Sequence, residues 1–143
     1  MIIYQLSVFL ENKPGRVSAA LETLSDNNID ISALSLADTE EYGIMRLIVD
    51  NPELAKQVLN DAGVIVKINH VIAIAMSDVP GGAGKIMRIL ADAGVNVEYL
   101  YAFVGKVSGK ALMVLRTDDQ KKAENILNAS GYNTVEVRDI YRI

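Results

Sequence analysis

Cysteine is absent from this sequence and histidine occurs only once. Without cysteine the chain has no disulfide, no thiolate metal site and no thiol nucleophile, and one histidine cannot form a histidine-rich metal cluster. Motifs for catalysis are missing too: there is no GxSxG sequence, and "PGGAGK" at residues 80–85 lacks the spacing of a P-loop. We therefore expect no enzyme activity, no cofactor and no metal site.

Basic stripes and long apolar runs are also missing. The formal net charge is −4, with residues of both signs interspersed, which argues against a nucleic-acid partner. No apolar run approaches the roughly 18 residues of a membrane span. The N-terminal "MIIYQLSVFLENK" has no basic region and is typical of a strand, not of a signal peptide. We expect a cytoplasmic protein that binds neither nucleic acid nor membranes.

What the chain does contain is a repeat. Its 143 residues are 50% hydrophobic, which predicts one compact globular unit or two very small ones. The turns "ENKPGRV" (11–17) and "SDVPGGA" (77–83) both place a polar residue two positions before a Pro-Gly pair, after an apolar alternating run. The two pairs are 66 residues apart (80 minus 14). Carried without a gap over residues 4–50, this offset pairs Gly43 with Gly109 and predicts that the halves are copies.

The repeat predicts its own secondary structure. After each Pro-Gly pair, apolar residues recur at the i, i+3, i+4, i+7 spacing of a helix packed on a sheet, as over residues 17–24. Asn28 and Gly94 occupy the positions where a left-handed cap would end these helices. Residues 50–52, Asp-Asn-Pro, predict the start of a second helix with proline at its first position.

Each half therefore consists of strand, helix, strand, strand, helix and strand. This order predicts an α+β fold: two ferredoxin-like βαββαβ repeats side by side, with antiparallel sheets and helices on one face. The closing strands are "VIVKI" (64–68) and "TVEVRDI" (134–140). Only Asn69-His70 breaks the run from the first closing strand into the next opening strand, so the predicted domains are residues 1–69 and 70–143.

Two long stretches, "LENKPGRVSAALETLSDNNIDI" and "MSDVPGGAGKIMRILADAGVNV", resemble the opening of ACT domains. These are small-molecule regulatory modules attached to amino-acid biosynthetic enzymes, in which a polar residue, Pro-Gly, an amphipathic helix and "(G/N)-(I/V)-(N/D)-I" recur. The resemblance covers nearly the whole chain as a tandem pair, and no catalytic domain accompanies it. It implies a non-catalytic allosteric sensor of a free amino acid, acting on a partner enzyme of amino-acid metabolism.

The resemblance also implies where the ligand binds. In ACT proteins the effector typically lies where two domains meet, between the loop before the first helix of one and the start of the second strand of the other. The ligand-binding residues implied here are Asn12, Gly15, Arg16, Asp30, Ile31, Met76, Asp78, Gly81, Gly82, Asn96 and Val97. Some members that bind serine have a histidine two residues before the loop asparagine, where this chain has Leu10 and Met76, a departure that argues against serine.

These residue types suit an amino-acid ligand. A helix opened by Pro-Gly has free backbone N–H groups and a dipole that favours an anion such as an α-carboxylate. Glycine lets the ligand approach the backbone closely. The carboxylates of Asp30 and Asp78, or the amide oxygens of Asn12 and Asn96, can accept hydrogen bonds from the ammonium group. Tyr99, Tyr101 and Met76 are candidates for an apolar or aromatic wall, and strand register decides which of them faces the ligand.

Structural interpretations stay open beside these. Asp30 and Asn96 stand at helix-to-strand junctions, where such residues often serve as caps, and Arg16 can simply face solvent. The alternative function is a regulatory subunit that docks on an amino-acid biosynthetic enzyme without its own ligand, which an exposed apolar patch over residues 99–104 would support. An enzyme or an RNA-binding domain of ferredoxin-like fold would need residues that this sequence lacks. Because the chain already contains two domains, a homodimer is compatible but not required.

Overall fold

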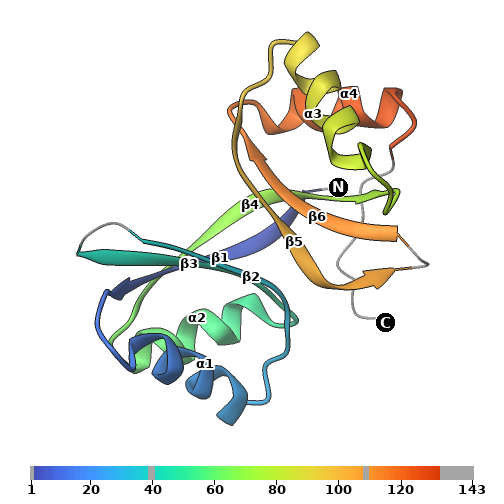
Figure 1. Ribbon diagram of the computed structural model, residues 1–143. Coiled ribbons are helices and arrows are strands. Elements are labelled where there is room, and N and C mark those ends of the chain that lie inside the picture. Colours follow the sequence, from blue (N-terminus) through green and yellow to red (C-terminus); the bar gives the residue numbers. More distant parts are fainter. Residues whose placement is uncertain (1, 39–40, 108–109, 133–143) are drawn as a thin grey trace. The chain divides into compact units, whose positions relative to one another are not determined.

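The computed structural model describes residues 2–38, 41–107 and 110–132, with side chains at 3–38, 41–104 and 110–132. The chain divides into two compact units: the first unit is Tyr4–Asn69, and the second unit is His70–Ile143 with Met1–Ile3. Strands and helices alternate along the chain (Figure 1). The elements are β1 (Ile2–Glu11), α1 (Arg16–Asp26), β2 (Ile31–Asp38), β3 (Tyr42–Val49), α2 (Pro52–Asp61), β4 (Ile65–Met76), α3 (Gly82–Asp92), β5 (Val97–Val107), β6 (Lys110–Thr117) and α4 (Gln120–Ala129).

In the first unit β3 lies between β1 and β2 and is antiparallel to both. Leu47 of β3 pairs with Leu6 on one side and with Leu34 on the other. Helices α1 and α2 cover one face of this sheet (Figure 1). The core between them is formed by Leu6, Val8, Leu10, Ala20, Leu24, Ile29, Met45, Leu47, Val49, Ala55, Leu59 and Val66. Burial of these apolar side chains is the main favourable term in the stability of the unit.

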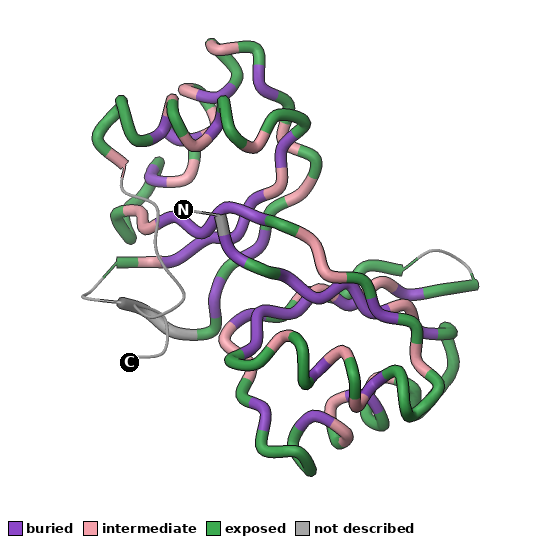
Figure 2. The backbone as a smooth tube through the Cα atoms, turned by 180° about the vertical axis from the view of Figure 1, so that it is seen from behind, coloured by how far each residue is buried: buried purple, intermediate pink, exposed green. Residues whose placement is uncertain are grey.

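The second unit repeats the arrangement with β6 between β4 and β5 and with α3 and α4 on one face. Leu115 of β6 pairs with Ile72 and with Leu100. The core contains Ile72, Ile74, Ile86, Leu90, Val95, Met113, Leu115, Ala123 and Leu127. Figure 2 shows that buried residues follow the strands and one side of each helix. The predicted α+β class, with antiparallel strands and helices on one face, is confirmed.

The helices of the described residues, α1 to α4, begin in two ways. α1 and α3 are preceded by Gly15 and Gly81, both left-handed with φ of 85°, and neither helix has a side-chain cap. α2 and α4 are capped by Asn51 and Asp119, whose side chains accept N–H groups of the first turn. The predicted proline at the first position of α2 is confirmed.

The predicted left-handed residues after α1 and α3 are also confirmed. Asn28 has φ of 57° and Gly94 has φ of 74°. Both positions close a helix and turn the chain into the next strand, where the left-handed conformation favours glycine or asparagine.

The predicted interruption of the strand at Asn69-His70 is wrong, because β4 runs through both residues as one strand. An Asn-His dipeptide alone therefore does not interrupt a strand whose flanking residues, Ile68 and Val71, are β-branched. The closing strand predicted at residues 134–140 lies outside the described residues.

The gap-free offset of 66 is also wrong beyond the second strand of each unit. Gly43 pairs with the next-to-last residue of β1, and Ala111 pairs with the last residue of β4, which is its counterpart at offset 66. Gly43 therefore corresponds to Ala111, at an offset of 68 (111 minus 43), and not to Gly109. The two extra residues lie in β5, where the register advances four residues from Ala102 to Lys106 against two residues of β6.

Candidate functional site

The loop between β1 and α1 contains the first half of the predicted site in the first unit. The Asn12 N–H donates to the carbonyl of Glu41 at 3.1 Å, and the Arg16 N–H donates to the carbonyl of Lys13 at 3.3 Å. These bonds tie the loop to the connection between β2 and β3 and to the start of the helix. Asn12, Gly15 and Arg16 are all exposed, so the side chains that the sequence predicts for binding are accessible.

Glu11 forms ion pairs with both basic residues of this loop, Lys13 and Arg16. Its Oε2 lies 3.0 Å from Lys13 Nζ and 4.0 Å from a guanidinium nitrogen of Arg16. The hydrogen bond from Lys13, and then the charges of Lys13 and Arg16, hold the pKa of the Glu11 carboxyl below its ordinary value. Because the pKa of Glu11 is lower in the folded protein than in the unfolded chain, its ionised carboxylate stabilises the fold when the pH is above the unfolded pKa. This contribution is lost as the pH falls through the folded pKa. A ligand carboxylate at Arg16 would therefore compete with Glu11.

A pocket of about 280 Å³ lies beside the loop, within the first unit. It is lined by Leu10, Glu11, Asn12, Lys13, Val17, Leu36, Asp38 and Gly43. The ends of β1 and β2 meet there because Gly43 of β3 pairs with Leu10 on one side and with Asp38 on the other. Of the residues predicted for binding, the pocket contains Asn12.

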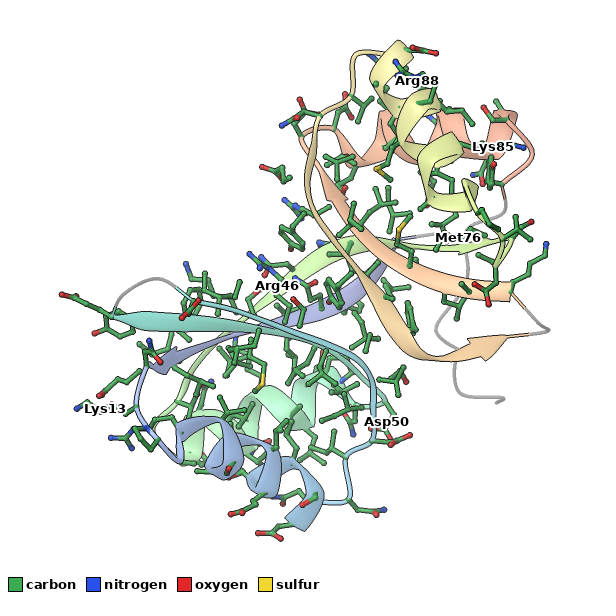
Figure 3. The ribbon with its side chains drawn as sticks, viewed as in Figure 1. Lys13, Arg46, Asp50, Met76, Lys85 and Arg88 are labelled. Carbon is green, nitrogen blue, oxygen red and sulfur yellow. The ribbon has the colours of Figure 1, made fainter. Side chains whose placement is uncertain are left out.

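Asp30 and Ile31, the second half of the predicted site, lie at the other end of the same sheet. Ile31 pairs with Val49, the last residue of β3, whereas Asp38 pairs near its start. The 8 residues of β2 span about 24 Å at about 3.4 Å per residue. Lys13 and Asp50, which mark the two ends, are far apart in the first unit (Figure 3). Within this unit one amino acid cannot touch both Asn12 and Asp30.

The backbone of Asp30 is held by Asp50. The Asp50 carboxylate accepts the N–H of Asp30 at 3.1 Å, and the Asp50 N–H donates to the carbonyl of Asp30 at 3.2 Å. The same pair of bonds joins Asp118 to Asn96, at 3.0 Å each. The junction is therefore fixed through its backbone, and the side chains of Asp30 and Asn96 are exposed.

The second unit separates its two halves in the same way. Met76 pairs with Ala111 near the start of β6, and Val97 pairs with Thr117 at its end. Asp78 and Asn96 are exposed, whereas Met76 is half-buried and packs against the core of the unit. Met76 and Asp78 therefore lie at one end of this sheet and Asn96 and Val97 at the other, and the wall role of Met76 stays a prediction.

The three glycines of the predicted site are there for different reasons. A Cβ on Gly15 or Gly81 would meet nothing within 4 Å, so the left-handed backbone at these positions, and not lack of room, favours glycine. A Cβ on Gly82 would lie against the carbonyl oxygen of Ser77, well inside van der Waals contact. Gly82 is buried, so its missing side chain allows the turn to close on its own backbone.

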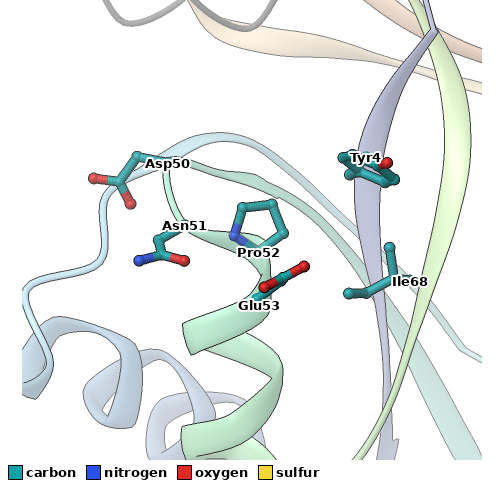
Figure 4. A pocket seen from close by; sticks show the side chains of 6 residues that line it. All are labelled: Tyr4, Asp50, Asn51, Pro52, Glu53 and Ile68. Carbon is teal, nitrogen blue, oxygen red and sulfur yellow. The ribbon is translucent and has the colours of Figure 1, made fainter.

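A second pocket, of about 330 Å³, lies at the Asp30 end of the first unit (Figure 4). It is lined by Tyr4, Asp50, Asn51, Pro52, Glu53 and Ile68. In Figure 4, the start of α2 faces Tyr4 and Ile68 across it. No residue predicted for binding lines this pocket, but Asp50 joins it to the backbone of Asp30.

Gln120 of the second unit occupies the position that Pro52 has in the first. Its Oε1 accepts the N–H of Thr117 at 2.8 Å, and its Nε2 donates to the carbonyl of His70 at 2.9 Å. The Arg116 guanidinium donates to the same carbonyl at 2.6 Å. Proline has no side-chain donor or acceptor, so Pro52 cannot make these bonds in the first unit.

Residues 2–38, 41–107 and 110–132 contain no group of three or more His, Cys, Asp and Glu side chains that could hold a metal ion. Among the same residues no helix is both long and apolar enough to cross a membrane.

Sequence reasoning missed most of the pocket beside Asn12. Leu36, Asp38 and Gly43 lie at the pocket only because β1, β2 and β3 pair with one another. No short stretch of the sequence predicts this pairing. One signal was present: Gly43 interrupts an otherwise bulky strand, where glycine usually marks a bulge or a close approach.

The chain matches the family model described as "ACT domain pair" over residues 1–143. A solved structure of a protein from Bacteroides thetaiotaomicron is 35% identical, with 100% of this chain and 98% of that chain covered and a TM-score of 0.91. The ligand-free regulatory subunit of aspartate kinase from Thermus thermophilus is 13% identical, with 91% and 97% covered and a TM-score of 0.64. Aspartate kinase from Synechocystis is 23% identical, with 94% and 27% covered and a TM-score of 0.58. Comparison with curated proteins finds no match.

Proposed function

Because the chain belongs to the ACT domain pair family, we propose that it is a non-catalytic regulatory protein that binds a free amino acid at the turns before α1 and α3. The observation that carries this proposal is the difference between the helix starts. α2 and α4 are capped by their own side chains, whereas α1 and α3 follow a left-handed glycine and have no side-chain cap. First-turn N–H groups without a side-chain acceptor suit an α-carboxylate.

The polar residues near these turns suit the other charge of an amino acid. Asn12 and Asp78 stand three residues before Gly15 and Gly81, and both are exposed. A carboxylate or an amide oxygen accepts hydrogen bonds from an ammonium group. Asp30 and Asn96 offer the same chemistry at the far end of each sheet, where they would serve a ligand held by another ACT domain.

Thermal unfolding in the presence of each common amino acid tests this function. A ligand at about 100 times its dissociation constant adds roughly 2.7 kcal/mol to the free energy of unfolding, which raises Tm by several degrees for a domain of this size. We expect one amino acid, or a chemically related group, to raise Tm. If none does so at millimolar concentration, the sensor function is wrong.

Two carboxylate variants locate the binding. Asp30→Ala and Asp78→Ala are expected to weaken the response to the ligand while the fold is kept, because each removes a candidate acceptor for the ammonium group. Asp26→Ala and Asp61→Ala are the matched controls, since both residues are exposed acids at helix ends away from the predicted site. Unchanged ligand affinity in Asp30→Ala and Asp78→Ala together would refute their role.

The second candidate function is a docking subunit of an enzyme of amino-acid metabolism, with no ligand of its own. It is favoured by exposed apolar side chains on β5: Leu100 is 47% exposed and Val104 is 73% exposed. Two of the structures similar in fold are an aspartate kinase and a regulatory subunit of one, which makes such an enzyme the partner to test first. In a binding assay with that enzyme, Leu100→Asp with Val104→Asp should abolish association if this function is correct.

A further inference from the structure

We propose that the pocket beside Asn12 selects amino acids with an aliphatic side chain no larger than that of leucine. This inference rests on the proposed function, because it names the class of ligand that the first ACT domain would take. It concerns the pocket that joins β1, β2, β3 and the first turn of α1, and no residue of the second unit.

The pocket is lined by both polar and apolar side chains. Glu11, Asn12, Lys13 and Asp38 are the polar ones, and Lys13 is already paired with Glu11 at 3.0 Å. Leu10, Val17 and Leu36 are the apolar ones, and together they are called the apolar wall. This composition suits an amino acid whose charged groups lie at the loop while its side chain packs on the apolar wall.

The apolar wall has no group that could satisfy a polar side chain. Leu10, Val17 and Leu36 carry neither donors nor acceptors, and a hydroxyl or amide placed against them would lose its hydrogen bonds to water. Leu36 is 53% exposed although it is on the same face of the sheet as the core residue Met45, its partner across the strands. A bound aliphatic side chain would cover it.

Gly43 sets the room available. Its backbone is ordinary strand, with no positive φ, so conformation does not explain a glycine there. A Cβ at this position would lie 3.3 Å from Cδ1 of Leu36, tight enough that the leucine side chain would have to move. The volume of about 280 Å³ is just below the range of about 300–1,000 Å³ that holds drug-sized ligands, so the occupant is small.

The second unit has a different set of side chains at the corresponding places. Ala102 replaces Leu36 and Ala111 replaces Gly43, as the strand registers show. The second unit therefore has the same strand pairing with alanine at both positions, so it serves as a comparison within the same chain. Ala111→Gly is the matched control for a substitution at Gly43.

Calorimetric titration with near-isosteric pairs tests the proposal. Valine is expected to bind about tenfold or more tightly than threonine, and leucine about tenfold or more tightly than asparagine, because a hydroxyl or amide on an aliphatic wall is worth that much discrimination. If threonine binds as well as valine, or if only polar amino acids bind, the aliphatic class is wrong while the sensor function stands. If no amino acid binds, the sensor function itself fails.

Two variants assign the selection to this pocket. Leu36→Ala should reduce the preference for valine over threonine severalfold, whereas Leu34→Ala, on the same face of β2 but outside the lining, should not. Gly43→Ala should weaken leucine more than alanine, and Ala111→Gly should change neither. Leu36 is more than half exposed, so its truncation leaves the fold intact, and an unchanged valine-to-threonine ratio in Leu36→Ala would overturn the proposal.

Discussion

Gly82 shows how a residue that suits a ligand can be required by the fold instead. Its side-chain position is occupied by the carbonyl oxygen of Ser77, and the residue is buried at the start of α3. Sequence reasoning interpreted this glycine as room for the ligand. In the structure the space beside Gly82 is occupied by the carbonyl oxygen of Ser77, so the glycine allows the turn before α3 to close.

Gly82→Ala is therefore expected to lower the free energy of unfolding by about 1–3 kcal/mol, because a methyl group forced into a packed site displaces backbone. Gly84→Ala is the control in the same helix turn: a Cβ there meets nothing within 4 Å, and alanine is favoured over glycine in a helix by up to about 1 kcal/mol. Urea unfolding of the two variants measures both effects. Equal stability of the two variants would contradict this account.

Residues that act locally were predictable, and residues that act through the sheet were not. Asn28, Gly94 and Pro52 were placed correctly because a helix end is decided by a few neighbouring residues. Leu36 and Asp38 were missed because more than 20 residues separate them from Asn12 in the sequence. Their place depends on which strands pair and in what register, and no single window of sequence contains that information.

At the scale of elements, the second unit joins α4 to two strands through one carbonyl oxygen. Gln120 of α4 and Arg116 of β6 both donate to the carbonyl of His70 in β4, at 2.9 and 2.6 Å. A backbone oxygen has two lone pairs, so both donors can be accepted together. These hydrogen bonds hold the start of α4 and the end of β6 against β4 at His70.

Removing one of the two side chains that donate to the His70 carbonyl should lower the free energy of unfolding less than removing both. Gln120→Ala is expected to lower the free energy of unfolding by about 1–3 kcal/mol, because the buried Thr117 N–H loses its acceptor although Arg116 still satisfies the carbonyl. The double variant Gln120→Ala with Arg116→Ala should lose more than the sum of the single variants, since neither side chain then donates to this oxygen. A double-mutant cycle from urea unfolding measures this coupling. Strict additivity would show that the two bonds are independent.

Elements themselves were largely predictable, because the spacing of apolar residues is strong for helices of this length. The position at which the offset between the halves changes was not. The glycines that end the second helices, Gly63 and Gly131, are already 68 residues apart in the sequence (131 minus 63). The match of Gly43 with Gly109 at an offset of 66 misplaced this change, which the pairing of β5 with β6 puts in β5. The closing strand predicted at residues 134–140 is not tested by the described residues.

At the scale of the molecule, β4 belongs to both units. Asn69 is the last residue of the first unit and His70 the first of the main segment of the second, yet they are consecutive residues of one strand. No linker separates them, so loss of structure in one unit removes the support of a strand that the other needs.

We therefore expect a single cooperative unfolding transition, with calorimetric and van't Hoff enthalpies that agree. Gly-Ser linkers inserted both between Asn69 and His70 and between Ile3 and Tyr4 should divide it into two transitions, because neither β4 nor β1 would then be shared by the two units. Differential scanning calorimetry distinguishes these outcomes. Two transitions in the unmodified chain would contradict the expectation.

The two extra residues of β5 have a consequence for how the halves could diverge. Neighbouring strand residues point to opposite faces, so an odd change in length exchanges the buried and the exposed set for the rest of the strand unless a bulge absorbs it. A change of two residues restores the phase, much as a triplet insertion preserves a reading frame. The register on either side of the insertion obeys this parity. Insertions and deletions in this strand are therefore tolerated more readily when they change its length by an even number of residues. Related proteins should differ in the length of this strand by even numbers of residues.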